Sequence, residues 1–370
     1  MYRFPFQRPQ LPAPQLWQHL LDAAYAQHRF SNHGPLALEL ERQLGRRVGR
    51  RVVLAANGTA AITAALLTLG RQGAVILPSF TFPATLGAVL QAGLQPVLAD
   101  VNPQTWEIDA PAIEAAAAAC KACGLPLAAV LGVRTFGLCR DWSAQQAWCD
   151  RHGVPLILDS AAALGGTLAD GAPVGRQGRM ETFSLHATKV FAVGEGGAIA
   201  CEPEDEPTLR RVMNFGLQEG QLQGWGFNGK MSEFSAAIGL AQDAQFDAQL
   251  RARRHAASAY AKLFATQAPD WRLAAGAGHP PWQAYPALAP TDEMADRFEL
   301  VAAQEGVQVR RYYRPALHTA PGVDAYAAGQ ALPVSEVLAR RMVCLPMYSL
   351  WREGELAELL AAVSRALTGM

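Results

Sequence analysis

Lysine is rare in this chain, and one of its four lysines, Lys189, lies between an alternating run and a glycine cluster in FSLHATKVFAVGEGGAIA (residues 183–200). Arginine supplies the rest of the positive charge, so the solubility of the chain does not depend on lysine. A buried lysine amine can lose its proton and attack a carbonyl, whereas a guanidinium stays protonated. A solvated surface lysine is the ordinary alternative. The setting of Lys189 favours a lysine that forms an imine.

Further polar and aromatic residues follow the ends of predicted strands. In ANGTAAI, residues 57–59 join a strand to a helix, whose free N–H groups and dipole suit a phosphate. In SFTFPAT, Phe82 could cover a planar ring, and Ser184 offers a hydroxyl. Asp159 ends the apolar run LILDS, where a buried carboxylate needs a cationic partner. A lysine, a carboxylate, a phosphate cradle and an aromatic lid together indicate pyridoxal 5′-phosphate.

Other cofactor sites have weaker support in the sequence. There is no G-x-x-x-x-G-K-[ST] and no G-x-G-x-x-G between a strand and a helix, so the P-loop and dinucleotide fingerprints are absent. Cys120 and Cys123 form C-x-x-C, but Cys139 and Cys149 lack the spacing of a second ligand pair. We therefore expect no metal site.

The elements that must position these residues alternate between apolar strands and helices. Continuous apolar strands separated by helices predict a mostly parallel sheet buried on both faces, with ligands beyond the carboxyl ends of the strands. The predicted strands are RVVLAAN, AVILPSF, QPVLADV, LAAVLGV and PLILDSA, and the helices between them include TAAITAALLTL, PATLGAVLQAG and DWSAQQAWCDRHG.

A long helical segment from about residue 232, with Ser232 as a plausible N-cap, follows this α/β region. At 370 residues the chain is long enough for two domains. We predict a large cofactor-binding domain over residues 1–240 and a smaller α/β domain over residues 241–370, joined by the long helix.

Charge and composition exclude several classes of partner. Lys plus Arg equals Asp plus Glu at 32 each, so no net field attracts nucleic acid or an acidic membrane. The start, MYRFPFQRPQLPAPQLW, lacks the apolar core of a secretory signal, and charges, glycines and prolines interrupt every apolar stretch before it could span a bilayer. We therefore expect a cytoplasmic protein with no membrane segment.

The motifs resemble, over nearly the whole chain, the DegT/DnrJ/EryC1/StrS aminotransferases. These are fold-type I pyridoxal-phosphate enzymes that act mainly on nucleotide-linked keto-sugars. Each motif is weak alone, but together, in this order, they are specific. The segments that carry the resemblance are SNHGPLALELERQLG, ANGTAAI, ILPSFTFPATLGAVLQAGLQPVLADV, LILDSAAALGG, SLHATKVFAVGEGGAIA, GFNGKMSEFSAAIGLAQ, YYRPALHTAPG and CLPMYSL.

The resemblance implies roles for individual residues. Lys189 would form the imine with the cofactor and carry protons, Asp159 would lie at the pyridinium nitrogen, and Phe82 would cover the ring. Asn228, in GFNGKMSE, would reach the cofactor phosphate of a neighbouring subunit, which implies a homodimer with shared sites. Gly58, Thr59 and Ser184 would hold the phosphate, and Asn32, His33, Lys230, Tyr313 and His318 fall in motifs on the sugar-nucleotide side.

Two positions depart from the family pattern. Members carry D-A-A-[HQ], but here the last position is Ala162, so a polar contact on the ring-hydroxyl side of the cofactor site is missing. Arg134, in GVRTFG, stands where many members have histidine, and it either alters substrate contacts or serves packing. The dehydratase branch has histidine in place of the imine-forming lysine, so Lys189 favours transamination.

The resemblance implies an aminotransferase that moves an amino group from glutamate to a nucleotide-linked keto-sugar. Among these acceptors it favours dTDP-4-keto-6-deoxy sugars. One alternative is a non-catalytic or regulatory pyridoxal-phosphate protein. Another is a pyridoxal-phosphate enzyme acting on an amino acid. The second is disfavoured by the lack of a C-terminal arginine motif for an α-carboxylate, although Arg310, Arg311 and Arg314 keep it open.

Overall fold

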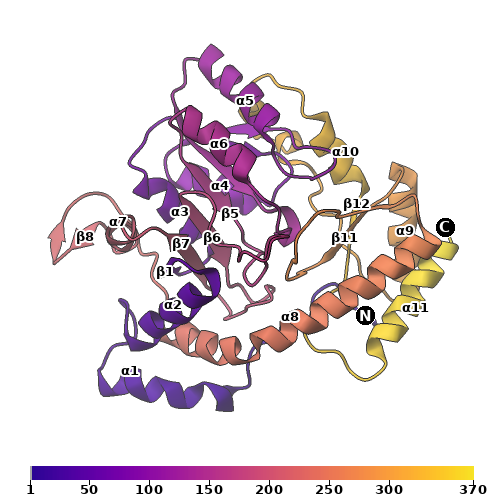
Figure 1. Ribbon diagram of the computed structural model, residues 1–370, viewed down its shortest axis with the longest axis horizontal. Coiled ribbons are helices and arrows are strands. Elements are labelled where there is room, and N and C mark those ends of the chain that lie inside the picture. The colour runs from indigo at the N-terminus through magenta and orange to yellow at the C-terminus, as the bar shows by residue number, and fades with distance from the viewer. Residues whose placement is uncertain (1) are drawn as a thin grey trace.

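The computed structural model describes residues 2–370 and is built around a seven-stranded sheet (Figure 1). The strand order is β1-β7-β6-β5-β4-β2-β3, and only β7 runs antiparallel to its neighbours. The mostly parallel α/β sheet predicted from the sequence is thereby confirmed. Its strands are β1 (Arg51–Ala55), β2 (Ala74–Pro78), β3 (Gln95–Ala99), β4 (Leu127–Val133), β5 (Leu156–Asp159), β6 (Met180–Ser184) and β7 (Gly197–Cys201).

Both faces of this sheet are buried, which explains its continuous apolar strands. In β5, Leu156 and Leu158 join one apolar cluster, whereas Ile157 joins the cluster on the other face. Successive strand residues point to opposite faces, so a strand covered on both sides has no polar alternation. The helices of this region are α2 (Pro35–Val48), α3 (Gly58–Thr68), α4 (Pro83–Gln91), α5 (Ala110–Ala122), α6 (Ser143–Arg151) and α7 (Glu206–Val212).

The long helix α8 (Glu233–Gln267) extends from beside α2 to α9 and α11 at the C-terminal end of the molecule (Figure 1). It begins after Ser232, whose Oγ accepts a hydrogen bond from the Ser235 N–H at 3.2 Å. Beyond it, three antiparallel strands form a second sheet. These elements are β10 (Arg272–Leu273), β11 (Tyr285–Leu288), β12 (Met342–Leu345), α9 (Asp292–Gln304), α10 (Pro333–Arg341) and α11 (Glu355–Thr368).

A boundary after residue 240 stays a prediction, because α8 is continuous across that point. One apolar cluster also joins the two parts, since Trp106 and Phe136 share it with Ala284, Leu338 and Cys344.

A hairpin of β8 (Leu217–Gln218) and β9 (Gln221–Leu222) projects from the body of the molecule (Figure 1). Around it, Phe215, Leu222 and Trp225 are exposed. Exposed large apolar side chains on a projecting segment are typical of a contact surface.

The remaining helix, α1 (Asp22–Ala26), precedes α2.

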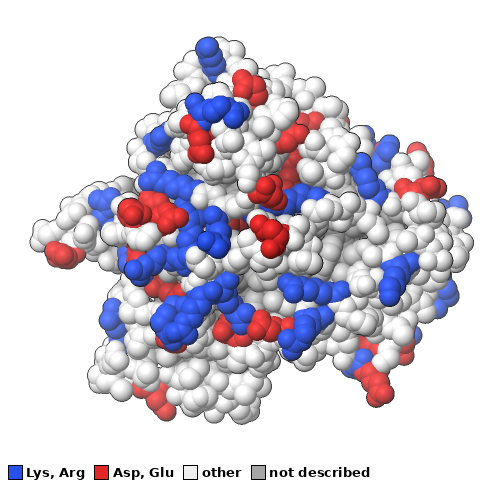
Figure 2. Space-filling model, viewed as in Figure 1, with Lys and Arg blue, Asp and Glu red and all other residues white. Residues whose placement is uncertain are grey.

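Acidic and basic side chains are interspersed over the face shown in Figure 2, in keeping with the balanced composition. Within residues 2–370, no helix combines the length and apolar character needed to cross a membrane. Cys120 is buried and Cys123 is exposed, and no cluster of three or more potential metal ligands occurs in this part of the chain.

Candidate active site

A cavity of about 840 Å³ lies beyond the carboxyl ends of β4 and β5, beside the first turns of α3 and α4. This is where open α/β sheets bind ligands. Nine of the predicted cofactor and substrate residues line it, namely Gly58, Thr59, Phe82, Asp159, Ala162, Ser184, Lys189, Asn228 and Tyr313, and Asn57 and Arg134 lie in its wall as well.

Asp159, the last residue of β5, is buried in the wall of the cavity. Its carboxylate accepts hydrogen bonds from Thr85 Oγ1 at 2.8 Å and from the Ala161 N–H at 3.1 Å. Burial raises the pKa of this carboxyl, and the two hydrogen bonds oppose that rise. No Lys, Arg or His nitrogen of residues 2–370 lies within 4.0 Å of it. The carboxylate is therefore free to pair with a cationic ligand.

Lys189 lies in the loop between β6 and β7. Burial lowers the pKa of its amine from 10.5 to about 8, and the charge of Asp159 partly opposes this shift. Its Nζ donates a hydrogen bond to Gln283 Oε1 at 3.1 Å, and Gln283 Nε2 donates to the carbonyl of Thr188 at 3.3 Å. A lysine amine with a lowered pKa is deprotonated more readily than an ordinary lysine, as an imine-forming residue requires.

The first turn of α3 offers a place for an anion. Asn57 caps the helix by accepting a hydrogen bond from the Ala60 N–H at 2.8 Å, whereas the Gly58 and Thr59 N–H groups have no partner among residues 2–370. A Cβ at Gly58 would lie 2.9 Å from the Ser184 Cβ, so glycine allows Ser184 to approach the helix terminus. Free N–H groups beside a hydroxyl suit a phosphate.

Two aromatic residues border the cavity in different ways. Phe82 precedes α4 and is 55% exposed although it lines the cavity, so its ring is available to cover a ligand. Tyr313 stacks on Phe136 with ring centroids 5.4 Å apart, and burial raises the pKa of its hydroxyl.

Four residues predicted on the substrate side do not line the cavity of this chain, namely Asn32, His33, Lys230 and His318. His33 Nδ1 lies 2.9 Å from Arg210 Nη1, and burial together with the charges of Arg210 and Lys230 lowers its pKa to about 4. The Lys230 Nζ lies 4.4 Å from the centre of the Phe215 ring. His318 Nδ1 is 2.6 Å from Ser79 Oγ. Their roles toward a substrate stay predictions.

Arg134, the second departure from the family pattern, is directed into the protein core. Its Nε donates to Glu181 Oε1 at 2.7 Å, and both side chains are fully buried. This contact agrees with the packing alternative for Arg134.

Sequence reasoning missed two polar residues of the site. Thr85 lies three residues after Phe82, in the first turn of α4, and this helical spacing could have placed both at the same edge. Gln283 lies in the segment before β11, far along the chain from Lys189, and no sequence motif marks it.

The residues of the cavity fit pyridoxal phosphate. They supply an amine with a lowered pKa, a buried carboxylate without a cation, unpaired N–H groups for a phosphate and an exposed aromatic ring. These are the groups expected of a protein that binds this cofactor.

Comparison with known proteins agrees with this geometry. Residues 17–364 match the model of the DegT/DnrJ/EryC1/StrS aminotransferase family. The chain belongs to this family. It is therefore a pyridoxal-phosphate-dependent aminotransferase of fold type I, as its motifs predicted.

Individual members of the DegT/DnrJ/EryC1/StrS family are similar along most of their length. The dTDP-4-amino-4,6-dideoxy-D-glucose transaminase of Shigella dysenteriae is 32% identical over 351 residues, which cover 92% of this chain and 93% of the relative. The crystal structure of DesI in the presence of its TDP-sugar product is 30% identical, with a TM-score of 0.86 over 100% of this chain and 95% of that one. A family member from Brucella abortus is 29% identical, with a TM-score of 0.86 and 94% of each chain covered.

Proposed function

We propose that this aminotransferase moves an amino group from glutamate to a nucleotide-linked keto-sugar, with a dTDP-4-keto-6-deoxy sugar as the preferred acceptor. The observation that carries the proposal is that Lys189 and Asp159 line one cavity of about 840 Å³. A cavity at the upper end of the usual size for small-molecule sites has room for a substrate as well as a cofactor. The dTDP- and TDP-sugars named for two relatives support the choice of acceptor.

Different residues of the cavity would bind different parts of the cofactor. Asp159 would pair with the pyridinium nitrogen, Phe82 would cover the ring, and Gly58, Thr59 and Ser184 would bind the phosphate. When bound, pyridoxal phosphate supplies the aldehyde that takes up the amino group and the ring that accepts an electron pair. Ala162 offers only its methyl group and backbone to this cavity.

Lys189 acts as the base and acid that moves a proton at the substrate carbon. Its lowered pKa leaves the Nζ able to take and return a proton near neutral pH. Gln283 orients the amine through the 3.1 Å hydrogen bond.

The active enzyme is a homodimer in which Asn228 of each chain serves the site of its partner. Asn228 is exposed at the rim of the cavity, next to the projecting hairpin. The exposed Phe215, Leu222 and Trp225 on that segment supply apolar surface for a second copy. A two-fold axis would place both hairpins in the same interface.

A cytoplasmic location accompanies this function. All six cysteines are free, as is usual in a reducing compartment.

The decisive experiment incubates the purified enzyme with pyridoxal phosphate, glutamate and a panel of dTDP-, UDP- and GDP-linked keto-sugars. The expected result is an aminated sugar nucleotide, detected by mass, with formation of 2-oxoglutarate in equal amount. Turnover of a dTDP-4-keto-6-deoxy sugar above the other acceptors supports the finer proposal. Absence of any aminated sugar, with glutamate consumed, would refute the proposed acceptor class.

A further inference from the structure

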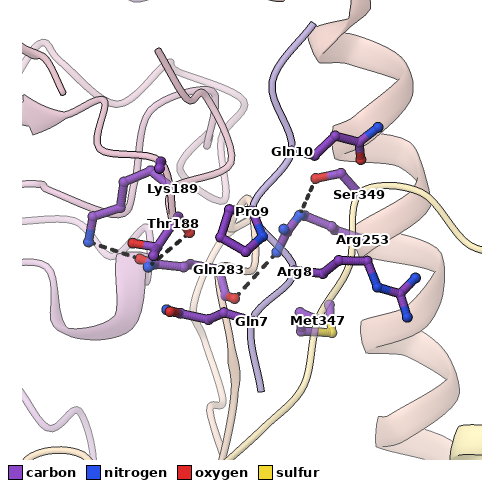
Figure 3. A pocket seen from close by; sticks show the side chains of 11 residues that line it. Gln7, Arg8, Pro9, Gln10, Thr188, Lys189, Arg253, Gln283, Met347 and Ser349 are labelled. Atoms are coloured by element: carbon purple, nitrogen blue, oxygen red, sulfur yellow. Dashed lines mark hydrogen bonds between the residues drawn. The ribbon is translucent and has the colours of Figure 1, made fainter. Parts of the chain in front are cut away.

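A small polar recess adjoins the main cavity at Lys189 (Figure 3). Its volume of about 10 Å³ is close to that of a single water or carboxylate oxygen. The N-terminal segment over residues 7–10 crosses it, and Lys189 and Gln283 line both the recess and the cavity. A group bound in the main cavity can therefore extend an oxygen into the recess.

Arg253, on α8, reaches this recess with an uncompensated charge. Its Nε donates to Ser349 Oγ at 2.9 Å, and its Nη1 donates to the carbonyls of Trp282 and Gln283 at 2.8 and 3.3 Å. These acceptors are neutral, and no carboxylate of residues 2–370 lies within 4.0 Å. Burial lowers the pKa of the guanidinium to about 9, with no acidic group to oppose the shift.

Three other arginines of this part of the chain, Arg8, Arg311 and Arg314, are already paired with carboxylates. Arg8, which also lines the recess, forms two hydrogen bonds to the Glu355 carboxylate, at 3.0 and 2.6 Å. Arg311 pairs with Asp296 and Glu299, and Arg314 pairs with Asp296. Because a buried unpaired charge is costly, Arg253 would be stabilised by an anion that enters the recess.

Gln283 connects this cation to the reacting amine. Its side chain accepts from Lys189 Nζ at 3.1 Å, and its backbone carbonyl accepts from Arg253 Nη1 at 3.3 Å (Figure 3). In any amino acid the α-carboxylate is two bonds from the amino nitrogen. An amino donor that reacts beside Lys189 must therefore place its carboxylate close to this lysine, on the side where a cation can receive it.

We propose that Arg253 binds the α-carboxylate of the amino donor, with one carboxylate oxygen in the recess. The Arg253 Nη2 has no hydrogen bond to residues 2–370 and is the group that meets this oxygen. This inference rests on the donor half of the proposed function and is independent of the sugar acceptor. It also explains how the chain can bind an amino acid without using Arg310, Arg311 or Arg314.

The test compares Arg253→Gln and Arg253→Lys with a neighbouring control, Arg254→Gln. Arg254 donates to the carbonyls of Gly165 and His279 and does not line the recess. The half-reaction uses holoenzyme and L-glutamate alone, with 2-oxoglutarate released per enzyme as the measurement. Loss of a charge-assisted hydrogen bond predicts that Arg253→Gln raises the half-saturating glutamate concentration about 10- to 100-fold. Arg253→Lys, which keeps the charge, should recover part of this loss.

A second measurement does not depend on turnover. Calorimetric titration of each holoenzyme with glutarate, which has both carboxylates of glutamate and no amine, should show weaker binding only in the Arg253 variants. The KM for the sugar-nucleotide acceptor should change less than threefold in every variant. A purely structural role for Arg253 would instead lower the melting temperature without a selective effect on glutamate.

The proposal is overturned if folded Arg253→Gln enzyme with full cofactor content binds glutarate and half-saturates with glutamate within twofold of wild type. If that variant does not fold, an unchanged glutamate dependence in Arg253→Lys overturns it equally. A wild-type enzyme that releases 2-oxoglutarate but aminates no sugar refutes only the proposed acceptor. In that case the Arg253 comparison still decides the inference.

Discussion

Asp159 and Lys189 face the same cavity, and burial shifts the pKa of each toward its neutral form. The pKa of the aspartate rises because a buried carboxylate loses hydration, and that of the lysine falls for the same reason. The two groups do not form an ion pair, so neither neutralises the other directly. Each therefore keeps the capacity to interact with a charged ligand, and perturbed groups in a cavity are typical of catalytic sites.

Replacement of Asp159 by asparagine tests its role at the pyridinium. The variant keeps the shape and one acceptor of the side chain but loses the charge that holds the ring nitrogen protonated. We expect kcat to fall at least about 100-fold, the scale of a lost electrostatic partner in a dry site, with cofactor still bound. Steady-state kinetics and cofactor absorbance check this, and near-normal turnover would contradict the assignment.

The lowered pKa of Lys189 predicts how cofactor capture depends on pH. Only the neutral amine is a nucleophile, so the rate at which apoenzyme takes up pyridoxal phosphate should rise with pH through about 8 and then level off. Borohydride reduction followed by peptide mapping should locate the cofactor on Lys189. A rate that keeps rising through pH 10, or a label on Lys121, Lys230 or Lys262, would contradict this prediction.

A buried ion pair links the two strands on either side of β5 beneath the site. Arg134 follows β4 and Glu181 lies in β6, so their contact spans β5, whose last residue is Asp159. Ser160 Oγ also donates to Glu181, and the Arg134 N–H donates to the carbonyl of Asp159 at 3.0 Å. The arginine at position 134 is thereby explained by the glutamate that faces it.

Glu181→Gln should destabilise the protein strongly, because it removes the only carboxylate that is hydrogen-bonded to the buried Arg134 guanidinium among residues 2–370. Breaking a buried pair in this way costs about 3–5 kcal/mol of the free energy of unfolding. Urea denaturation measures it. The matched control is Glu358→Gln, which removes the exposed pair with Arg3 and should cost less than about 1 kcal/mol. Equal losses in the free energy of unfolding for the two substitutions would show that the buried ion pair stabilises the protein no more than the exposed one.

The exposed apolar residues of the β8–β9 hairpin would become buried if two copies of the chain associated through this segment. A single chain exposes Leu222 and Trp225 by 72% and 67%. Asn228 lies a few residues further along the same segment, at the rim of the cavity. A shared interface would bury the apolar surface and complete the cofactor site at once.

Subunit exchange between two inactive variants tests this shared site. Lys189→Ala and Asn228→Ala, once mixed, should form heterodimers in which one site has both defects and the other has neither. We expect activity to return toward about half of the wild-type value per heterodimer, because a two-fold dimer has two equivalent sites. Mass spectrometry verifies exchange. Complete exchange without activity would assign Asn228 to the site of its own subunit.

The chemistry of this protein and most of its central sheet were predictable from the sequence. Short apolar runs such as LILD, followed by turn residues, favour buried strands. Parallel strands bring their carboxyl ends to one edge, so Asp159 and Phe82 were expected to converge there. Lys189 was conspicuous because its residue type is rare in this chain. These features depend on residues close together in the chain, so they can be recognised in a single sequence.

Only the tertiary structure decided which distant side chains meet these residues. Gln283 contacts Lys189 although it lies 94 positions further along the chain. Arg253, on α8, lines the same recess as Lys189. Glu181, on β6, forms an ion pair with Arg134. Such contacts depend on how the C-terminal sheet and α8 pack against the large sheet, and no periodicity records that packing. These contacts form because a buried polar group without a hydrogen-bond partner costs free energy, so each buried polar side chain is paired with a group that the fold brings close to it.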